Sequence, residues 1–285
     1  MEITQVWRYA VKSMIGETVD SGELSELGMV GDRTWAARDL ERGGIRGAKK
    51  IAPLMTLAAV DLGDGHAEIT LPDGSTVGTM DPDVDERVSA ALDHPVRLER
   101  LRPASDAEHF RRGAPDHDDP ITELRAVFGR AEDEPLPDFS LFPREMNTML
   151  RQFESPPGTY YDAFPLMVMT EQALQALHSA LPDSGIDVRR FRPSFVIDAP
   201  EDSSNDMGHP EFDWAGRSAQ IGSAVVEFAM PCPRCIMVSR EVDESIPQDR
   251  GVLRHIVSEL DQNVGVYATV TTPGTIRTGD RVTFL

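Results

Sequence analysis

The sequence predicts a mostly β fold of the α+β class, with a barrel-like domain at the N-terminus and a few short helices in the C-terminal part. Short runs of β-branched and aromatic residues recur along the chain, and glycine, proline and aspartate turns separate them. Few segments place apolar residues at helical spacing. The 285 residues are enough to bury a substantial core in one large domain or two ordinary ones.

Residues 1–102 are predicted to form a β-barrel-like domain. Its strands follow runs of strand-forming residues, and Pro72, Asp73 and Gly74 supply a hairpin turn. A short helix interrupts these strands, with Asp81 or Asp83 near its cap. The predicted strands are residues 3–9, 17–24, 33–38, 54–62, 67–71, 75–77 and 95–101, and the predicted helix is 83–92.

Residues 103–150 are predicted to be a surface insertion or connecting region. Most of this stretch is polar, and its second half is acidic and rich in proline. One short helix is expected at 121–128. His109 and His117 lie here, and a histidine in such a loop is typically solvated rather than a metal ligand.

Residues 151–285 are predicted to form a second, strand-rich domain. Thr170 is expected to cap a helix at 171–181, in which Leu174 and Leu177 have core spacing. A polar loop is expected at 202–213, and a second helix at 247–260. The expected strands are residues 166–169, 194–198, 224–229, 236–239, 265–270 and 282–285.

The net charge of −20 limits the classes of partner. Sequence-independent nucleic-acid binding depends on basic residues that neutralise phosphates, and anionic membrane surfaces also attract basic segments. No segment has the roughly 18 to 20 consecutive apolar residues of a membrane helix, and residues 1–7 lack a signal-peptide pattern. Two cysteines cannot form a secreted disulfide framework. We therefore expect a cytoplasmic protein that binds neither nucleic acid nor a membrane.

Lysine is rare and confined to one part of the chain. The three lysines, Lys12, Lys49 and Lys50, all lie in the first 50 residues, whereas there are 25 arginines. One explanation is compositional drift from lysine to arginine. The other is that the retained ammonium groups contact a phosphate, for which a compact point charge is suited.

Both cysteines, Cys232 and Cys235, lie in one Pro-Cys-Pro-Arg-Cys stretch. A structural zinc site needs about four donors, and no second cysteine pair exists. A thioredoxin-like dithiol is expected at the start of a helix, whereas residues 236–239 are strand-like. Two buried apolar cysteines are a third possibility, but the flanking prolines indicate a rigid turn. The residues favour a single thiolate beside Arg234, a form that binds soft metals, and leave the other possibilities open.

Three C-terminal motifs, taken together, resemble the MOSC domain, which is named for the C-terminal domain of molybdenum cofactor sulfurases. They are Pro-Cys-Pro-Arg-Cys-Ile-Met-Val at 231–238, Phe-Arg-Pro-Ser-Phe-Val-Ile at 191–197 and Pro-Gly-Thr-Ile-Arg-Thr-Gly-Asp at 273–280. Three N-terminal motifs are similar to motifs of the β-barrel domain that precedes MOSC in amidoxime-reducing proteins. They are Val-Lys-Ser at 11–13, Gly-Asp-Arg-Thr-Trp at 31–35 and Gly-Ala-Lys-Lys at 47–50. The resemblance implies a MOSC N-terminal barrel domain at 1–102 and a MOSC β-barrel at 151–285.

The resemblance also implies that the chain binds the molybdenum cofactor (Mo-molybdopterin). Cys235 has the position of the catalytic cysteine that binds the metal, whereas no role is implied for Cys232. Ser194 stands where relatives have asparagine, and Glu171 where a small hydroxyl residue is usual. Helix capping is the alternative role for Thr170 and Glu171. The positions similar to cofactor-contacting residues are Lys12, Ser13, Arg33, Thr170, Glu171, Arg192, Ser194, Arg234 and Tyr267.

The implied activity is that of an oxidoreductase that reduces N-hydroxylated small molecules. Electrons are expected from an external donor protein of the ferredoxin or flavin reductase type, because two cysteines cannot hold an iron–sulfur cluster. One alternative is a molybdenum cofactor carrier or sulfur-transfer protein without its own turnover. A thiol redox protein that uses Cys232 and Cys235 is the other.

Overall fold

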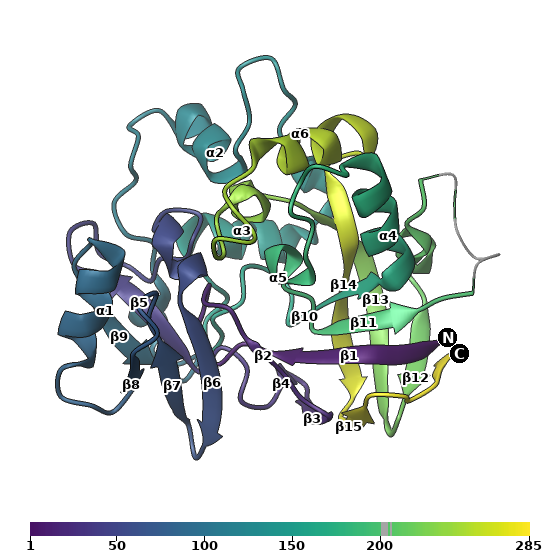
Figure 1. Ribbon diagram of the computed structural model, residues 1–285, viewed down its shortest axis with the longest axis horizontal. Coiled ribbons are helices and arrows are strands. Elements are labelled where there is room, and N and C mark those ends of the chain that lie inside the picture. Colours follow the sequence, from purple (N-terminus) through teal and green to yellow (C-terminus); the bar gives the residue numbers. More distant parts are fainter. Residues whose placement is uncertain (201–204, 206) are drawn as a thin grey trace.

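A computed structural model describes residues 1–200, 205 and 207–285. Its largest element is a curved sheet of eight strands (Figure 1). This strand-rich structure confirms the predicted mostly β, α+β class. The strands, in order across the sheet, are β16 (Val282–Phe284), β12 (Ser218–Ile221), β13 (Ala224–Pro233), β14 (Asn263–Thr272), β10 (Leu166–Thr170), β11 (Phe195–Asp198), β1 (Glu2–Arg8) and β2 (Glu17–Thr18).

The first strand of the chain belongs to this C-terminal sheet. β1 pairs antiparallel with β11, and its apolar side chains Ile3 and Val6 are fully buried in the same core as Phe195. Burial of alternate residues on one face fixes the register of such a strand. The Met1 carbonyl accepts a hydrogen bond from the Val282 amide at 3.1 Å, so the two ends of the chain lie next to each other (Figure 1).

Smaller sheets make up the rest of the N-terminal part. They are β15 (Gly274–Arg277) with β3 (Ser21–Ser25) and β4 (Gly28–Met29), β5 (Trp35–Asp39) with β9 (Val96–Arg100), and β6 (Ala58–Gly63) with β7 (His66–Thr70) and β8 (Thr76–Gly78). β3, β4 and β15 pack into the core of the large sheet, whereas the 3₁₀ turn η1 (Ala52–Thr56) and helix α1 (Val84–Leu92) close the core of the last two sheets. Met237 and Ile246 of the C-terminal part pack into that core, so the two halves share an apolar interior.

Short helices cover one side of the large sheet. They are α4 (Glu171–Ala180), α5 (Val188–Phe191), α6 (Arg250–Glu259) and the 3₁₀ turn η6 (Ile236–Ser239), whereas the 3₁₀ turn η5 (Pro210–Trp214) packs Trp214 into the core on the other face. The side chain of Thr170 accepts a hydrogen bond from the Ala173 amide at the start of α4, so the predicted cap is confirmed. In the described part of the chain, no helix is long and apolar enough to cross a membrane.

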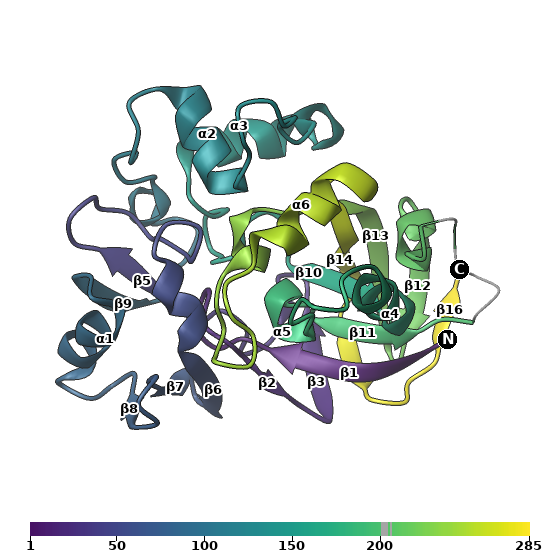
Figure 2. The ribbon, with the colours of Figure 1, turned by 45° about the horizontal axis from the view of Figure 1, so that its top comes forward.

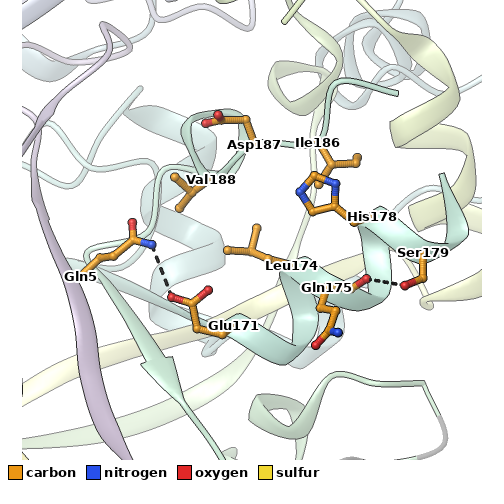
Figure 3. Close-up of a pocket in the computed structure, with 9 residues that line it drawn as sticks. All are labelled: Gln5, Glu171, Leu174, Gln175, His178, Ser179, Ile186, Asp187 and Val188. Atoms are coloured by element: carbon orange, nitrogen blue, oxygen red, sulfur yellow. Dashed lines mark hydrogen bonds between the residues drawn. The ribbon is translucent and has the colours of Figure 1, made fainter. Parts of the chain in front are cut away.

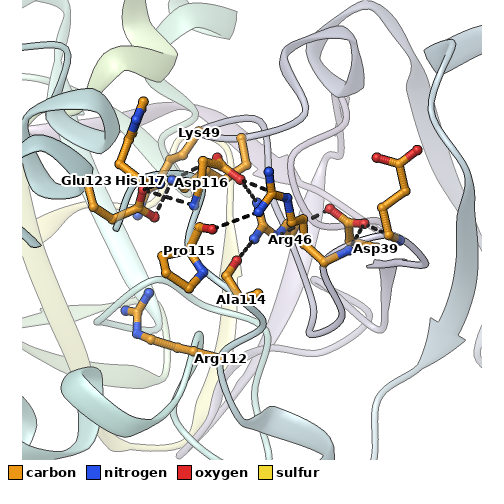
Figure 4. Close-up of polar contacts among 12 residues, drawn as sticks. Asp39, Arg46, Lys49, Arg112, Ala114, Pro115, Asp116, His117 and Glu123 are labelled. Atoms are coloured by element: carbon orange, nitrogen blue, oxygen red, sulfur yellow. Dashed lines mark hydrogen bonds and ion pairs between the residues drawn. The ribbon is translucent and has the colours of Figure 1, made fainter. Parts of the chain in front are cut away.

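Residues 103–152 hold four short helical elements: η2 (Ala107–Phe110), α2 (Pro120–Phe128), η3 (Phe139–Leu141) and α3 (Arg144–Gln152). Figure 2 shows α2 and α3 beside α6. Ion pairs fasten this segment to the N-terminal part (Figure 4). Asp116 lies 2.7 Å from Arg46 and 3.0 Å from Lys50, and Arg46 also pairs with buried Asp39 at 3.3 Å. The helix predicted at 121–128 is confirmed as α2, whereas η2, η3 and α3 were not predicted.

Several other local predictions also need correction. Residues 236–239 form a 3₁₀ turn rather than a strand, because Met237 packs into the N-terminal core while Val238 packs into the C-terminal one. Residues 54–56 likewise belong to η1, before β6 begins. In both places tertiary burial overrides strand propensity. Part of the predicted polar loop at 202–213, residues 202–204 and 206, lies outside the described residues.

Candidate functional site

Three predicted site residues have a left-handed backbone. Ser13, Arg33 and Arg192 have φ angles of 68°, 49° and 58°. Such a conformation costs a non-glycine residue about 1 kcal/mol or more and persists only where the surroundings hold it. Ser13 is held through its side chain, which accepts a hydrogen bond from the Ala48 amide at 3.0 Å. Strain of this kind is typical of binding sites.

Arg33 and Arg192 lie against the same tyrosine. Their guanidinium carbons are 5.2 and 4.2 Å from the centroid of the Tyr9 ring. Arg33 pairs with buried Asp32, which also accepts a hydrogen bond from the Tyr9 amide at 2.7 Å. Arg192 donates to the Met14 carbonyl, but its Nη2 is buried without a partner among the described residues. Burial, with the charge of Arg33, lowers the pKa of Arg192 to about 10.

A second cluster joins Lys12, Lys49 and Asp162. Lys12 Nζ lies 2.7 Å from one oxygen of Asp162, and Lys49 Nζ lies 2.8 Å from the other. Lys12 is buried and also donates to the Tyr160 carbonyl at 2.7 Å. Burial acts to raise the pKa of Asp162, but Lys12 and Lys49 outweigh it and hold that pKa well below its usual range. Asp162 also acts electrostatically on Arg33 and Arg192, so the two clusters are neighbours.

The cysteine stretch completes the group. β13 carries Cys232, and its pairing with β14 is irregular at Phe228–Met230 and Pro231–Pro233. Such bulges redirect side chains at the end of a strand. Arg234 donates to the Val264 carbonyl at 2.8 Å and to the Phe191 carbonyl at 3.0 Å. These bonds tie the stretch to α5, whose C-cap residue is Arg192.

The two cysteines lie in different environments. Cys232 is 2% exposed, and burial raises the pKa of its thiol, which hydrogen bonds with Tyr267. Cys235 is half-buried and begins η6. Both cysteines are free thiols. Only Cys235 therefore combines a thiol with access from outside.

Three cations surround Cys235. Burial lowers the pKa of Arg130 and of Arg240, and a charged Cys235 opposes this in both. Burial is the largest single influence on Lys49 and acts to lower its pKa, but the negative charges of Asp162, Cys235 and Glu154 together outweigh it and raise that pKa. Arg130 Nη2 donates to the Arg234 carbonyl at 3.0 Å. The site thus has a surplus of positive charge in a chain of net charge −20.

Some of these residues were not identified from the sequence. Asp162, Tyr9, Arg130 and Arg240 stand outside any motif, and Arg130 lies in the segment predicted to be a surface insertion. Lys49 was marked by the rarity of lysine and by the Gly-Ala-Lys-Lys stretch, but it was not assigned to the site. No sequence signal separates Arg130 from the other arginines, because its position depends on how α2 packs against η6.

Of the remaining predicted positions, two lie close to this group. Ser194 is bonded to Met167 through its amide at 2.7 Å, and Met167 Sδ accepts a hydrogen bond from Arg234 at 3.2 Å. Tyr267 stacks on Phe164, with ring centroids 4.8 Å apart, and bonds with Cys232. Their contacts with a cofactor remain predictions.

Thr170 and Glu171 lie at the other end of β10. Thr170 caps α4 and donates to buried Glu211 at 2.7 Å. Glu171 accepts a hydrogen bond from Thr4 at 2.6 Å and lines an open hollow with Gln5 and His178 (Figure 3). Three residues of strand, about 10 Å, separate Thr170 from Met167. The assignment of Thr170 and Glu171 as cofactor contacts likewise remains a prediction.

One of the two loop histidines differs from expectation, whereas His117 is exposed as predicted. His109 is buried, and its Nε2 lies 2.7 Å from the Tyr160 hydroxyl, while its Nδ1 lies 3.2 Å from Glu99. The expectation that His109 is solvated was wrong, because η2 packs it against the core of Phe110 and Tyr160. Among the described residues, no group of three or more histidine, cysteine or acidic side chains could hold a metal ion.

Family models match both parts of the chain. Residues 156–283 match the MOSC domain, and residues 1–101 match the MOSC N-terminal beta barrel domain. The chain is a MOSC domain protein. Residues 102–155 of this MOSC domain protein lie outside both matches.

Curated relatives of this MOSC domain protein share low sequence identity with it. Mitochondrial amidoxime-reducing component 1 of Mus musculus is 24% identical, over 99% of this chain and 82% of its own length. Mitochondrial amidoxime reducing component 2 of Homo sapiens is 28% identical, over 43% of this chain and 38% of its own length.

Solved structures are also similar at low identity. The YUAD protein from Bacillus subtilis aligns at 10% identity and a TM-score of 0.45, over 99% of this chain and 94% of that chain. YiiM from Geobacillus stearothermophilus aligns at 14% identity and a TM-score of 0.31, over 43% of this chain and 54% of that chain.

Proposed function

We propose that this MOSC domain protein is a molybdenum-cofactor-dependent oxidoreductase that reduces N-hydroxylated compounds with electrons from an external donor protein. One observation carries the proposal: a half-buried free thiol, Cys235, lies in a cationic site that includes a buried arginine nitrogen without a hydrogen-bond partner among the described residues. The matched family and the names of the relatives point to the same cofactor and reaction.

The residues present fit the chemistry of that cofactor. A buried unpartnered donor costs free energy unless a ligand satisfies it, and Arg192 Nη2 is such a donor. The site contains five positive charges and two negative charges. The negative charges are Asp32 and Asp162, and the positive ones are Lys12, Lys49, Arg33, Arg192 and Arg234. Arg33 and Arg192 would hold the phosphate of the pterin. Cys235 would provide the single soft ligand that molybdenum needs beside the two sulfurs of the pterin.

The remaining positions carried over from the family are proposed contacts with the pterin. Lys12 donates to the Tyr160 carbonyl, Ser13 accepts from the Ala48 amide, and Arg234 joins the cysteine stretch to α5. Ser194 and Tyr267 lie beside this group. Thr170 and Glu171 complete the proposed set, although their present contacts are those of a helix cap.

When bound, the cofactor supplies the redox chemistry that breaks the N–O bond. The balanced reaction takes an N-hydroxyl group, two electrons and two protons, and gives an N–H group and water. The chain cannot supply the electrons from an iron–sulfur cluster, because it has only two cysteines. An external donor of the ferredoxin or flavin reductase type is therefore part of the proposal, as is a cytoplasmic location, where such thiols stay reduced.

The test is molybdenum and pterin content, measured side by side on anaerobically purified wild type, Cys235→Ala and Cys232→Ala. The wild type should hold both, Cys235→Ala should lose most of its molybdenum, and Cys232→Ala should keep it. Absence of both molybdenum and pterin from the wild type would refute the proposal. Bound cofactor without reduction of any N-hydroxylated substrate, when an artificial donor is supplied, would indicate a carrier instead.

A further inference from the structure

Five aromatic side chains form a continuous row beside the cysteine stretch. Successive ring centroids lie 4.8, 6.3, 6.1 and 5.5 Å apart. These separations are in the range in which aromatic rings attract one another. In order, the row consists of Tyr267, Phe164, Phe142, Phe139 and Phe128.

The inner end of the row adjoins the site. Tyr267 pairs with Met230 in the strand that carries Cys232, and Asp162 and the Cys232 thiol both act electrostatically on Tyr267. Phe164 follows Asp162 by two residues and packs on the Tyr267 ring. A molecule bound beside Asp162 and Cys235 would therefore meet these rings first.

The outer end of the row returns to the same cysteine stretch. α2 ends at Gly129 (φ 65°), where an added Cβ would lie 3.1 Å from the Cβ of Ile236, the residue after Cys235. Arg130 then donates to the Phe128 carbonyl at 2.6 Å and to the Arg234 carbonyl at 3.0 Å. Both ends of the row are thus fastened to residues 232–236, and the rings border one side of that stretch.

Exposure differs along the row. Phe142 and Phe164 are 7% and 8% exposed, whereas Phe128, Phe139 and Tyr267 are half-buried. The buried rings give the row its packing, and the half-buried ones keep part of their surface accessible. Phe128, Phe139 and Phe142 come from residues 102–155, which neither family match covers.

We infer that this row is the substrate-recognition wall of the site, and that it selects N-hydroxylated compounds that carry a flat aromatic group. The inference rests on the proposed function for the reaction, but the row itself is a property of this chain. An aromatic substrate would stack on the half-buried rings, while its N-hydroxyl group points toward Cys235. Phe139 and Phe128 are the specificity-determining residues, because they are half-buried and, unlike Tyr267, are not among the proposed cofactor contacts.

The experiment compares Phe139→Leu and Phe128→Leu with the matched control Phe153→Leu. Phe153 is half-buried in the same segment, but it packs against Arg111 and is not part of the row. Steady-state rates are measured on cofactor-loaded protein with an artificial donor, for benzamide oxime and for acetamide oxime. Each row variant should lower kcat/KM for benzamide oxime by about five-fold, mainly through KM, and leave acetamide oxime unchanged. The control should change neither.

Calorimetric binding of benzamide oxime without an electron donor gives a second measurement that does not depend on turnover. It should weaken by about five-fold in both row variants and stay unchanged in Phe153→Leu. An equal loss for both substrates, or no loss of binding, would overturn the inference. If the wild type turns over neither substrate, the proposed reaction fails, whereas the binding measurement still decides the role of the row. Should Phe139→Leu not fold, Phe139→Trp tests the same ring with the opposite expectation, a stronger preference for benzamide oxime.

Discussion

Arg190 and Arg192 lie two residues apart at the end of α5, and both are buried, yet they have different surroundings. Arg192 donates to one carbonyl and keeps a buried nitrogen without a partner in the described structure. Arg190 instead donates to four backbone carbonyls, those of Gly185 at 2.6 Å, Val238 at 3.4 Å, Arg240 at 2.9 Å and Pro247 at 2.8 Å. The comparison teaches that satisfaction of the donors, rather than burial, separates an arginine used by the fold from one available to a ligand.

The surroundings of the two ends of β10 differ in a similar way. Buried atoms without partners also occur near Thr170, on His209 and Glu211, within the described residues. Those two residues are 1% and 0% exposed, whereas the Asp162 side chain at the opposite end is 37% exposed. A buried polar atom without a hydrogen-bond partner therefore indicates a binding site only where a ligand can reach that atom.

The largest expected effect comes from Arg190→Met. It removes the partner of four buried carbonyls and should lower the free energy of unfolding by about 3 kcal/mol. Arg192→Met should lower it by less than about 1 kcal/mol, because one bond is lost and one unpartnered donor disappears. Urea unfolding of cofactor-free protein checks both, and molybdenum content should fall about ten-fold or more in folded Arg192→Met. Equal destabilisation by the two changes would contradict the distinction between them.

Asp162→Ala should have an intermediate effect. It leaves Lys12 and Lys49 without their shared carboxylate, and we expect a loss of about 2 kcal/mol, below the range for a fully buried pair because Asp162 is partly exposed. The pKa of Asp162 is lowered in the folded state, so its contribution is complete above about pH 4 and is lost as the pH falls further. The difference from wild type should therefore shrink below about pH 4 in unfolding measurements. A difference that grows toward acid pH would show that Asp162 is not held ionised.

The smallest expected effect is that of Thr170→Ala. It removes the cap of α4 and the bond to Glu211, and should cost about 1 kcal/mol in a thermal or urea unfolding experiment. Thr170→Ser keeps both bonds and serves as the control. Molybdenum content should be unchanged in both variants if Thr170 acts as a cap. A loss of molybdenum in folded Thr170→Ala would instead favour the family assignment of this residue as a cofactor contact.

Much of the fold could be predicted from local patterns. The runs at 3–9, 67–71 and 224–229 form strands because β-branched and aromatic residues suit a pleated, partly buried surface. The run at 236–239 has similar residues but forms a turn, since its side chains fill two different cores. In 103–152 the helix at 121–128 was predicted, but η2, η3 and α3 were missed for a related reason, because tertiary contacts such as the ion pair of Arg46 with Asp116 order the polar residues of that segment.

The sequence by itself determined the class of fold, the cap at Thr170 and the family of the chain, whereas the rigid turn predicted at 231–233 was wrong, because these residues pair with β14 as the end of strand β13. These features depend on residues that are close together or in a fixed order. Only the tertiary structure decided that Cys232 is buried while Cys235 is accessible, and that Asp162 and Arg130 join the site. The physical reason is that burial and electrostatic potential are sums over neighbours, and these neighbours come from segments more than 100 residues apart in the chain.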